Sequence, residues 1–187
     1  MKTVDLRYGM KIVEVPKHRD KRGYFLPGID TEVIEELLGR KPMCTVENIS
    51  YSKGKVIRGM HWQVAPFQQG KLIRVLSGSI YDVGVVIDST SKEYRGWEGV
   101  YIHANSNKAI WIPETMAHGF QVITNEAIVM YTVTAPYSLT HAWGFRWDDC
   151  HVEIKWPVSG GEILSEKDRN APALYECVKS NETCAVS

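Results

Sequence analysis

Between residues 44 and 135, short hydrophobic runs alternate with polar turn residues in a pattern typical of β-strands. The runs are rich in valine, isoleucine, tyrosine and threonine, and clusters of glycine, serine, asparagine and aspartate separate them. They cover residues 44–52, 55–62, 71–87, 99–104, 108–113, 119–124 and 127–135. The turn sequence SGS within the third run predicts a tight hairpin. Many short strands with regular turns favour an antiparallel sandwich or barrel.

One helix precedes this β-rich region, over residues 30–40 with the sequence DTEVIEELLGR. Asp30 or Thr31 can cap its start, and Gly39 can end it. Its apolar residues recur at helical spacing and form one stripe, made of Val33, Ile34, Leu37 and Leu38.

The length and composition are those of one globular domain. With 187 residues, 44% of them hydrophobic, the chain can bury a core without disulfide or metal staples. The stretch 154–174 shows no regular pattern, and the last residues are polar. We therefore expect a single domain over residues 1–175 and a loosely ordered tail over residues 176–187.

The charge is balanced, with 22 Lys and Arg against 22 Asp and Glu, so the composition favours neither nucleic acid nor an anionic membrane. No apolar run reaches the roughly 18 residues that span a bilayer, and the first residues lack the apolar core of a signal peptide. We expect a cytoplasmic protein with reduced thiols. The four cysteines form no CxxC pair, which argues against a zinc site: Cys44, Cys150, Cys177 and Cys184.

Polar side chains interrupt the strands where a buried core would be expected. Arg58, His61, Gln63 and Lys71 lie in or beside two predicted strands, and His118 lies in a glycine-flanked site, AHGF. For a single histidine, a hydrogen-bonded structural role is the commoner interpretation. A polar cluster in a sheet, however, costs free energy unless its groups are paired or used.

Strand geometry raises a difficulty for Arg58 and His61. Side chains alternate along a strand, so residues three positions apart point to opposite faces. Gly59 lies between the two and could mark a bulge that changes the alternation. With such a bulge, both side chains would face the same way.

Two histidines in a β-barrel suggest a metal-binding cupin, whose site usually combines an HxH pair with a carboxylate and a third histidine. Here Gln63 stands where the second histidine of the pair would be, and His118 stands singly. We therefore expect no functional metal.

Two tyrosines and an aspartate each leave two interpretations open. Tyr131 and Tyr137 flank TVTAP and could fill the core or supply a phenol as proton donor. Asp168, in LSEKDRN, could cap a turn or orient a histidine and stabilise its charged form.

Eight segments occur in an order and at a spacing typical of one family. They are DKRGYF (20–25), ENISYSKGKVIRGMHWQ (47–63), QGKLIRVLSGSIYDV (69–83), AHGFQVIT (117–124), YTVTAPY (131–137), GFRWDD (144–149), IKWP (154–157) and LSEKD (164–168). Each is weak alone, but together they are specific and span nearly the whole chain. The chain resembles dTDP-4-dehydrorhamnose 3,5-epimerase and its relatives, the cupin-like epimerases of nucleotide-linked 4-keto-6-deoxy sugars.

The resemblance implies an all-β fold: a cupin-like jelly-roll barrel with a few short peripheral helices, working as a homodimer. It implies that His61 is the general base and Asp168 its dyad partner. Tyr131 would be the proton donor on the opposite face of the sugar, and Lys71 would lie beside the keto oxygen. It further implies that a set of residues binds the nucleotide-sugar, namely Arg22, Phe25, Asn48, Arg58, Gln63, His118, Tyr137 and Lys167.

These roles agree with the chemistry of a 4-keto sugar. A proton next to a ketone is acidic because the resulting carbanion delocalises as an enolate. A neutral imidazole suits the base, and an ammonium stabilises the negative charge that grows on the oxygen. Returning a proton from the other face inverts carbon 3, carbon 5 or both. Since the ketone is already present in the substrate, we expect no cofactor; the product would serve deoxysugar and polysaccharide biosynthesis.

Three positions depart from the family pattern. Pro27 and Ala142 stand where glutamates are usual, and Val46 replaces the glutamine of a QxN element. Each change removes a polar partner, a loss of about 1–3 kcal/mol when buried. Either the substrate carries CDP or GDP or is inverted at one carbon only, or neighbouring residues such as Trp62, Gln68 or Trp143 compensate.

Other functions stay open on the sequence alone. A sugar ketoisomerase could use a related barrel, although the intact set of His, Lys, Tyr and Asp in epimerase order argues against it. A non-catalytic cupin would bind a nucleotide-sugar without exchanging any sugar proton. A metal-dependent cupin dioxygenase is the remaining alternative.

Overall fold

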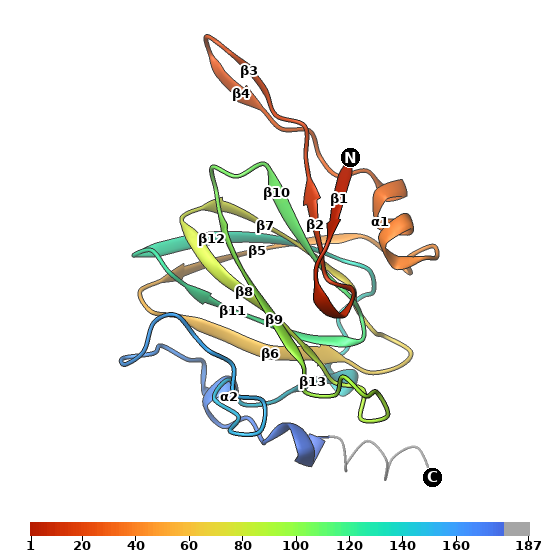
Figure 1. The fold of residues 1–187 in the computed structure, drawn as a ribbon, viewed down its shortest axis with the longest axis vertical. Coiled ribbons are helices and arrows are strands. Elements are labelled where there is room, and N and C mark those ends of the chain that lie inside the picture. The colour runs from red at the N-terminus through yellow and green to blue at the C-terminus, as the bar shows by residue number, and fades with distance from the viewer. Residues whose placement is uncertain (178–187) are drawn as a thin grey trace.

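The computed structural model of the protein describes residues 1–177, and its longer strands form two antiparallel sheets that face each other (Figure 1). From edge to edge, the strands of the six-stranded sheet are β1 (Lys2–Asp5), β2 (Lys11–Glu14), β10 (Lys108–Ile112), β7 (Lys71–Ser77), β12 (Glu126–Val133) and β5 (Val46–Lys53). Those of the five-stranded sheet are β13 (Ala142–Gly144), β6 (Ile57–Gln63), β11 (Met116–Val122), β8 (Ser79–Val86) and β9 (Trp97–His103). This architecture confirms the predicted jelly-roll class.

Alternate residues of both sheets meet in one hydrophobic cluster, which we call the inner core. Because side chains alternate along each strand, one face of β7 and one face of β8 can both point inward. The inner core is closely packed and almost fully buried, and its members include Ile73, Val75, Ile80, Ile110, Ile112, Phe120, Val122 and Val129.

Two further clusters cover the outer faces of the sheets. The C-terminal segment packs its apolar residues on the outer face of the five-stranded sheet, and we call this the outer cluster: Met60, Trp62, Tyr81, Val83, Val85, Ala117, Phe145, Val152, Leu174 and Cys177. Helix α1 (Thr31–Leu38) covers part of the other sheet through Ile34, which is buried with Leu72 and Trp111. Both sheets are therefore partly shielded from solvent on their outer sides.

The predicted strands are all present, but the predicted hairpin is wrong. β7 ends at Ser77 and β8 begins at Ser79, yet β7 pairs with β10 and β12, whereas β8 pairs with β9 and β11. Gly78, in a left-handed conformation with φ 76°, carries the chain from one sheet to the other. The chain bends at Gly78, but strand pairing is decided by the neighbours available across each sheet.

The predicted helix is confirmed as α1, and Gly39 ends it in a left-handed conformation. Asp30 occupies the N-cap position, although its side chain makes no capping hydrogen bond. The remaining helices are short: α2 (Glu166–Arg169), η1 (Arg7–Gly9) and η2 (Leu139–His141). Within the described part of the chain, none of the helices has the length and hydrophobicity needed to cross a membrane.

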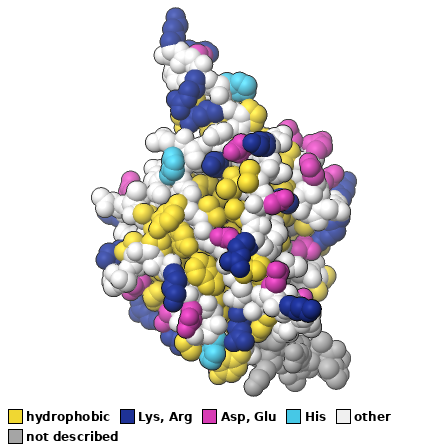
Figure 2. All heavy atoms as spheres, viewed as in Figure 1, with side chains coloured by type: hydrophobic (Ala, Val, Ile, Leu, Met, Phe, Trp, Pro, Cys, Tyr) yellow, Lys and Arg dark blue, Asp and Glu magenta, His cyan; other side chains and the backbone are white. Residues whose placement is uncertain are grey.

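Strands β3 (His18–Asp20) and β4 (Gly23–Phe25) were not predicted from the sequence. They form a two-stranded hairpin that projects beyond both sheets (Figure 1). Lysine and arginine side chains gather on this projection (Figure 2).

Most of the predicted tail, including Cys184, lies outside the described residues, whereas Glu176 and Cys177 still have helical backbone.

The bulge predicted at Gly59 is confirmed. Across the pairing of β6 with β11, His118 lies opposite His61 and Phe120 lies opposite Arg58. The two pairs are three residues apart along β6 but only two residues apart along β11. The extra residue in β6 shifts the alternation of side chains, so Arg58 and His61 point to the same face of the sheet. Gly59 has a φ of 127°, and a Cβ there would lie 2.5 Å from the Cα of Gly119.

We expect Gly59→Ala to lower the free energy of unfolding by at least about 2 kcal/mol, because it combines backbone strain with a backbone clash. Urea unfolding followed by tryptophan fluorescence measures this. The matched control is Gly28→Ala, where φ is not positive and a Cβ meets no atom within 4 Å. There the change should stay within about 1 kcal/mol. Equal midpoints for the two variants would contradict the need for glycine at the bulge.

Candidate functional site

The structure brings His61 and Asp168 together although they lie 107 positions apart in the sequence. Nε2 of His61 lies 2.6 Å from Oδ1 of Asp168. Ser165 caps α2 and accepts a hydrogen bond from the backbone N–H of Asp168, which fixes the carboxylate beside β6. The His61 side chain is 40% exposed and that of Asp168 only 5%, so the imidazole faces solvent and the carboxylate supports it from behind.

The Asp168 carboxylate is stabilised in its charged form. Burial by itself would raise its pKa, but the hydrogen bond and charge of His61, with further hydrogen bonds from Ser165 and the Gly59 backbone, outweigh burial and lower the pKa. Asp168 therefore stays ionised around neutral pH and places a negative charge against the His61 ring.

Lys71 places a buried amine next to this pair. Its Nζ donates to the backbone carbonyl of His61 at 3.4 Å, and the residue is only 7% exposed. Burial lowers the pKa of Lys71 to about 8, and the charge of Asp82 opposes that shift. The amine is thus poised between its charged and neutral forms near physiological pH.

Asp82 is a member of the site that sequence reasoning missed. It is fully buried on β8, and its Oδ1 lies 2.7 Å from Nε2 of His118 on β11. The signal was present in the sequence, because Asp82 interrupts the otherwise apolar strand IYDVGVV. A carboxylate in a buried strand requires a partner. Here it orients His118 and supplies a negative charge near Lys71.

Tyr131 faces the barrel interior from the opposite sheet. It lies on β12 between Ile73 of β7 and Asn48 of β5, and it packs against the inner core. Ile73 belongs to the inner core, so Tyr131 and Asn48 share its inward orientation. The phenol and the His61 imidazole therefore approach the interior from different sheets.

Arg58 joins the two sheets at their open edge. Its guanidinium donates from Nε to Oγ of Ser52 and from Nη2 to the carbonyl of Tyr51, each at 3.0 Å. Ser52 and Tyr51 lie on β5, whereas Arg58 lies on β6. A permanently charged group is therefore held near the rim of the site.

Gln63 uses its side chain to hold the loop that follows β12. Its amide nitrogen donates to the carbonyls of Phe67 and Pro136, and its oxygen accepts from the backbone N–H of Ser138. The bonds to Pro136 and Ser138 fix the segment that carries Tyr137, whose side chain is exposed, and the bond to Phe67 ties that segment to the connection between β6 and β7. Gln63 thus positions Tyr137, and a direct contact of Gln63 with substrate stays a prediction.

The structure does not bring Arg22 and Phe25 to the other predicted residues. Both lie on the projecting β3–β4 hairpin, where Arg22 pairs with Asp20 and Phe25 is largely exposed. Lys167, by contrast, directly precedes Asp168 on α2. The family segments give the order of these residues along the chain but not their distances in space. The sequence could therefore not reveal that Arg22 and Phe25 lie apart from the other predicted residues.

Metal-ligand spacing is found away from this group. Among residues 1–177, one cluster of three donors has such spacing, and it consists of Asp149, Cys150 and His151. It includes neither His61 nor His118. The interior group instead offers a base with a carboxylate partner, a buried amine, a phenol and an arginine, which together suit proton abstraction next to a carbonyl.

Comparison with known proteins agrees with this arrangement. A family model described as dTDP-4-dehydrorhamnose 3,5-epimerase matches residues 7–176. A relative of that name from Shigella flexneri is 40% identical over 84% of this chain and 86% of its own length. Another, from Sinorhizobium fredii, is 37% identical over 89% of this chain and 86% of its own length.

Solved structures are similar along almost the entire chain. A dTDP-6-deoxy-D-glucose-3,5-epimerase from Legionella pneumophila, in complex with dTDP-4-keto-L-rhamnose, superposes with a TM-score of 0.87 at 32% identity, covering 93% of each chain. A 4-keto-6-deoxy sugar epimerase from Streptomyces spheroides gives a TM-score of 0.88 at 29% identity, covering 97% of this chain and 91% of its own.

Proposed function

The chain belongs to the dTDP-4-dehydrorhamnose 3,5-epimerase family, and we propose that it inverts carbons 3 and 5 of a dTDP-linked 4-keto-6-deoxyhexose. Its relatives make it an isomerase of deoxysugar biosynthesis that acts on a nucleotide-sugar. The observation that carries the proposal is the pairing of His61 with Asp168 beside the buried amine of Lys71.

His61 is the general base in this mechanism. Its imidazole is the exposed member of the pair, so it can reach a carbon-bound proton of the sugar. The bond to Asp168 fixes one ring nitrogen, which leaves Nδ1 to accept the proton. The ionised carboxylate then stabilises the imidazolium that forms.

Lys71 stabilises the intermediate. When the proton leaves carbon 3 or carbon 5, its electron pair delocalises onto the keto oxygen of carbon 4 as an enolate. An ammonium held in a buried position stabilises that oxygen strongly, because little water screens it. Asp82 supports this role by keeping more of Lys71 protonated than burial alone would allow.

Tyr131 returns a proton from the other side. It faces the interior from the six-stranded sheet, whereas His61 faces it from the five-stranded sheet. A sugar ring between the two would lose a proton to one face and gain one at the other, which inverts the carbon. Asn48 and His118 lie beside these groups and would orient the sugar through hydrogen bonds.

Two cations flank the base and its partner. Arg58 precedes His61 by three residues and shares its face, and Lys167 precedes Asp168 by one. Guanidinium and ammonium groups at this rim suit the diphosphate of a nucleotide-sugar.

A CDP- or GDP-linked sugar is the second candidate substrate. Val46 on β5 pairs with Val133 on β12, which in turn pairs with Lys71 on β7. Ala142 on β13 pairs with Gln63 on β6. Two of the three departures from the family pattern thus border the site, where they remove polar partners for a ligand.

A homodimer completes the proposal. The outer face of the six-stranded sheet exposes three large apolar side chains, with Ile49 66%, Tyr51 54% and Leu76 46% exposed. Exposed apolar patches of this kind mark association surfaces. In a dimer, the projecting hairpin could carry Arg22 and Phe25 to the site of the partner, which accounts for their distance from His61 here.

Deuterium exchange tests the assignment of base and acid. With dTDP-4-keto-6-deoxyglucose in deuterium oxide, the unmodified protein should incorporate deuterium at carbons 3 and 5. His61→Asn should lower exchange and inversion by at least about 100-fold, since a positioned base typically contributes 10²–10⁴-fold. Tyr131→Phe should lower inversion by a similar factor and exchange by much less. Mass spectrometry and proton NMR follow both.

Tyr101→Phe, at an exposed tyrosine of β9, is the matched control and should leave both rates unchanged. Exchange at one carbon alone would make the protein a single-centre epimerase. Exchange with only CDP- or GDP-linked sugar would support the second substrate. Binding without exchange of any of the three would refute the catalytic proposal and favour a non-catalytic cupin.

The pH dependence of kcat/KM tests Lys71. The charged amine stabilises the enolate, and its pKa is lowered to about 8, so kcat/KM should fall as the pH rises above about 8. In Lys71→Arg the guanidinium stays charged, so this alkaline fall should disappear whatever the absolute rate. The same fall near pH 8 in both proteins would assign it to another group.

Sedimentation velocity tests the dimer. Ile49→Glu places a charge in the exposed apolar face and should convert a dimer into a folded monomer with much lower epimerase activity, because the hairpin no longer reaches a partner. The control is Leu139→Glu, at a residue that is 77% exposed in η2, which should stay dimeric and active. A dimeric Ile49→Glu protein would exclude this face as the interface.

A further inference from the structure

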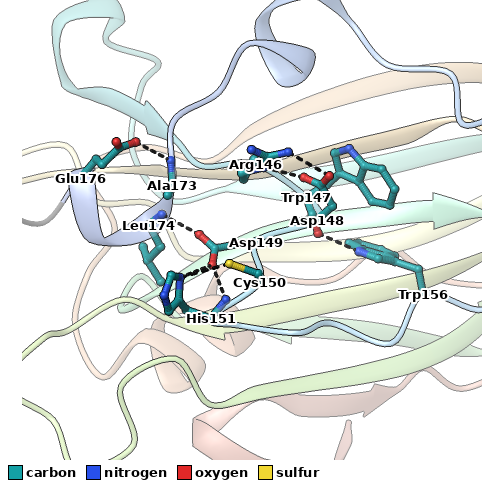
Figure 3. Close-up of polar contacts among 10 residues, drawn as sticks. All are labelled: Arg146, Trp147, Asp148, Asp149, Cys150, His151, Trp156, Ala173, Leu174 and Glu176. Carbon is teal, nitrogen blue, oxygen red and sulfur yellow. Dashed lines mark hydrogen bonds and ion pairs between the residues drawn. The ribbon is translucent and has the colours of Figure 1, made fainter.

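Three consecutive side chains after β13 bring donor atoms of three kinds together. The Asp149 carboxylate, the Cys150 thiol and the His151 imidazole have ligand atoms within 4.8 Å of one another (Figure 3). Sγ of Cys150 lies 3.4 Å from Nδ1 of His151, and that nitrogen lies 3.6 Å from Oδ1 of Asp149. Around a tetrahedral zinc ion, the bond lengths to N, O and S place neighbouring ligand atoms about 3.4–3.6 Å apart. Two of the three spacings therefore already match those of a zinc site, and the third, between the Cys150 sulfur and the Asp149 carboxylate, is within 4.8 Å.

Asp149 is fixed by contacts that leave it aimed at the other two donors. Its residue is 3% exposed, and its carboxylate accepts backbone hydrogen bonds from His151 at Oδ1 and from Leu174 at Oδ2, both at 2.8 Å (Figure 3). Leu174 is anchored in the outer cluster. A carboxylate held in this way loses little conformational entropy on binding a cation.

The other two donors are accessible from solvent. Cys150 is exposed, and the His151 side chain is 54% exposed. The His151 ring also lies edge-on to the ring of Tyr175, with centroids 5.9 Å apart, which restricts its rotation. A metal ion can therefore enter from solvent and find two of its three ligands already oriented.

The local charge favours a cation. Asp148 and Glu176 add carboxylates to that of Asp149, and Arg146 is engaged by Asp148 through two hydrogen bonds. Among these four groups, three carboxylates outnumber one guanidinium, so together they carry a net negative charge.

We propose that Asp149, Cys150 and His151 bind a divalent transition-metal ion of the zinc class, with water as the fourth ligand. Binding releases the thiol proton to solvent and forms a sulfur–metal bond. The ion would tie the loop after β13 to the segment around Leu174, so its role is structural. The donors lie on the side of the outer cluster, apart from His61 and Lys71, and the site does not depend on the epimerase assignment.

Titration of zinc into untagged, chelator-treated full-length protein tests the site, with competition against a zinc indicator dye. One equivalent should bind. Cys150→Ser and His151→Asn should each weaken zinc binding by at least about 10–100-fold. Loss of a residue that only hydrogen-bonds to a metal ligand already costs that much affinity, and these two residues are ligands themselves. Cobalt(II) should show thiolate-to-metal absorption that Cys150→Ser abolishes. Circular dichroism should show that both variants, changed at exposed positions, stay folded.

Cys44→Ser removes a different, partly exposed thiol and is the matched control, so zinc affinity and the cobalt absorption should persist. Unchanged zinc affinity in Cys150→Ser would place the metal elsewhere and overturn the proposal. Failure of the unmodified protein to bind micromolar zinc would overturn it as well. Neither outcome would bear on the exchange experiments with nucleotide-sugar, so the two proposals fail independently.

Discussion

The bulge at Gly59 is the constraint on which the interior of the barrel depends. Without the extra residue in β6, Arg58 and His61 would point to opposite faces, and one of them would leave the site. The bulge also requires two glycines, because the backbones of β6 and β11 approach so closely at Gly59 and Gly119 that no Cβ fits. A local irregularity of one strand therefore positions a charged group and a base together.

The polar interior is tolerated because its charges compensate one another. Burying an unpaired carboxylate or ammonium costs several kcal/mol, yet Asp82 is bonded to His118 and acts on Lys71 as well. Asp168 gains more from His61 and backbone donors than it loses through burial. The contacts that offset the desolvation of these groups also hold them in orientations useful for proton transfer. The same hydrogen bonds and charge pairs therefore serve both stability and function.

Much of the fold could be read from local pattern, and the errors are instructive. The helix ending at Gly39 and the strands between residues 44 and 135 follow from periodicity and turn residues, which act over a few positions. The hairpin at Gly78 was wrong because a turn sequence states only that the chain reverses, while the pairing partner depends on strands far away in sequence. Asp82 was missed because its partner, His118, is also distant.

The sequence by itself determined the β-rich class, the family and the residue types of the site, because these follow from the spacing and order of residues along the chain. The resemblance already implied that Asp168 partners His61, whereas only the tertiary structure decided that Lys71 is buried enough to lower its pKa and that Arg22 and Phe25 lie on a separate projection. The tertiary structure likewise brought the backbone N–H of Leu174 to Asp149, which helps to fix that carboxylate beside Cys150 and His151. The physical reason is that burial and the direction of a side chain are properties of long-range packing, which no local pattern specifies.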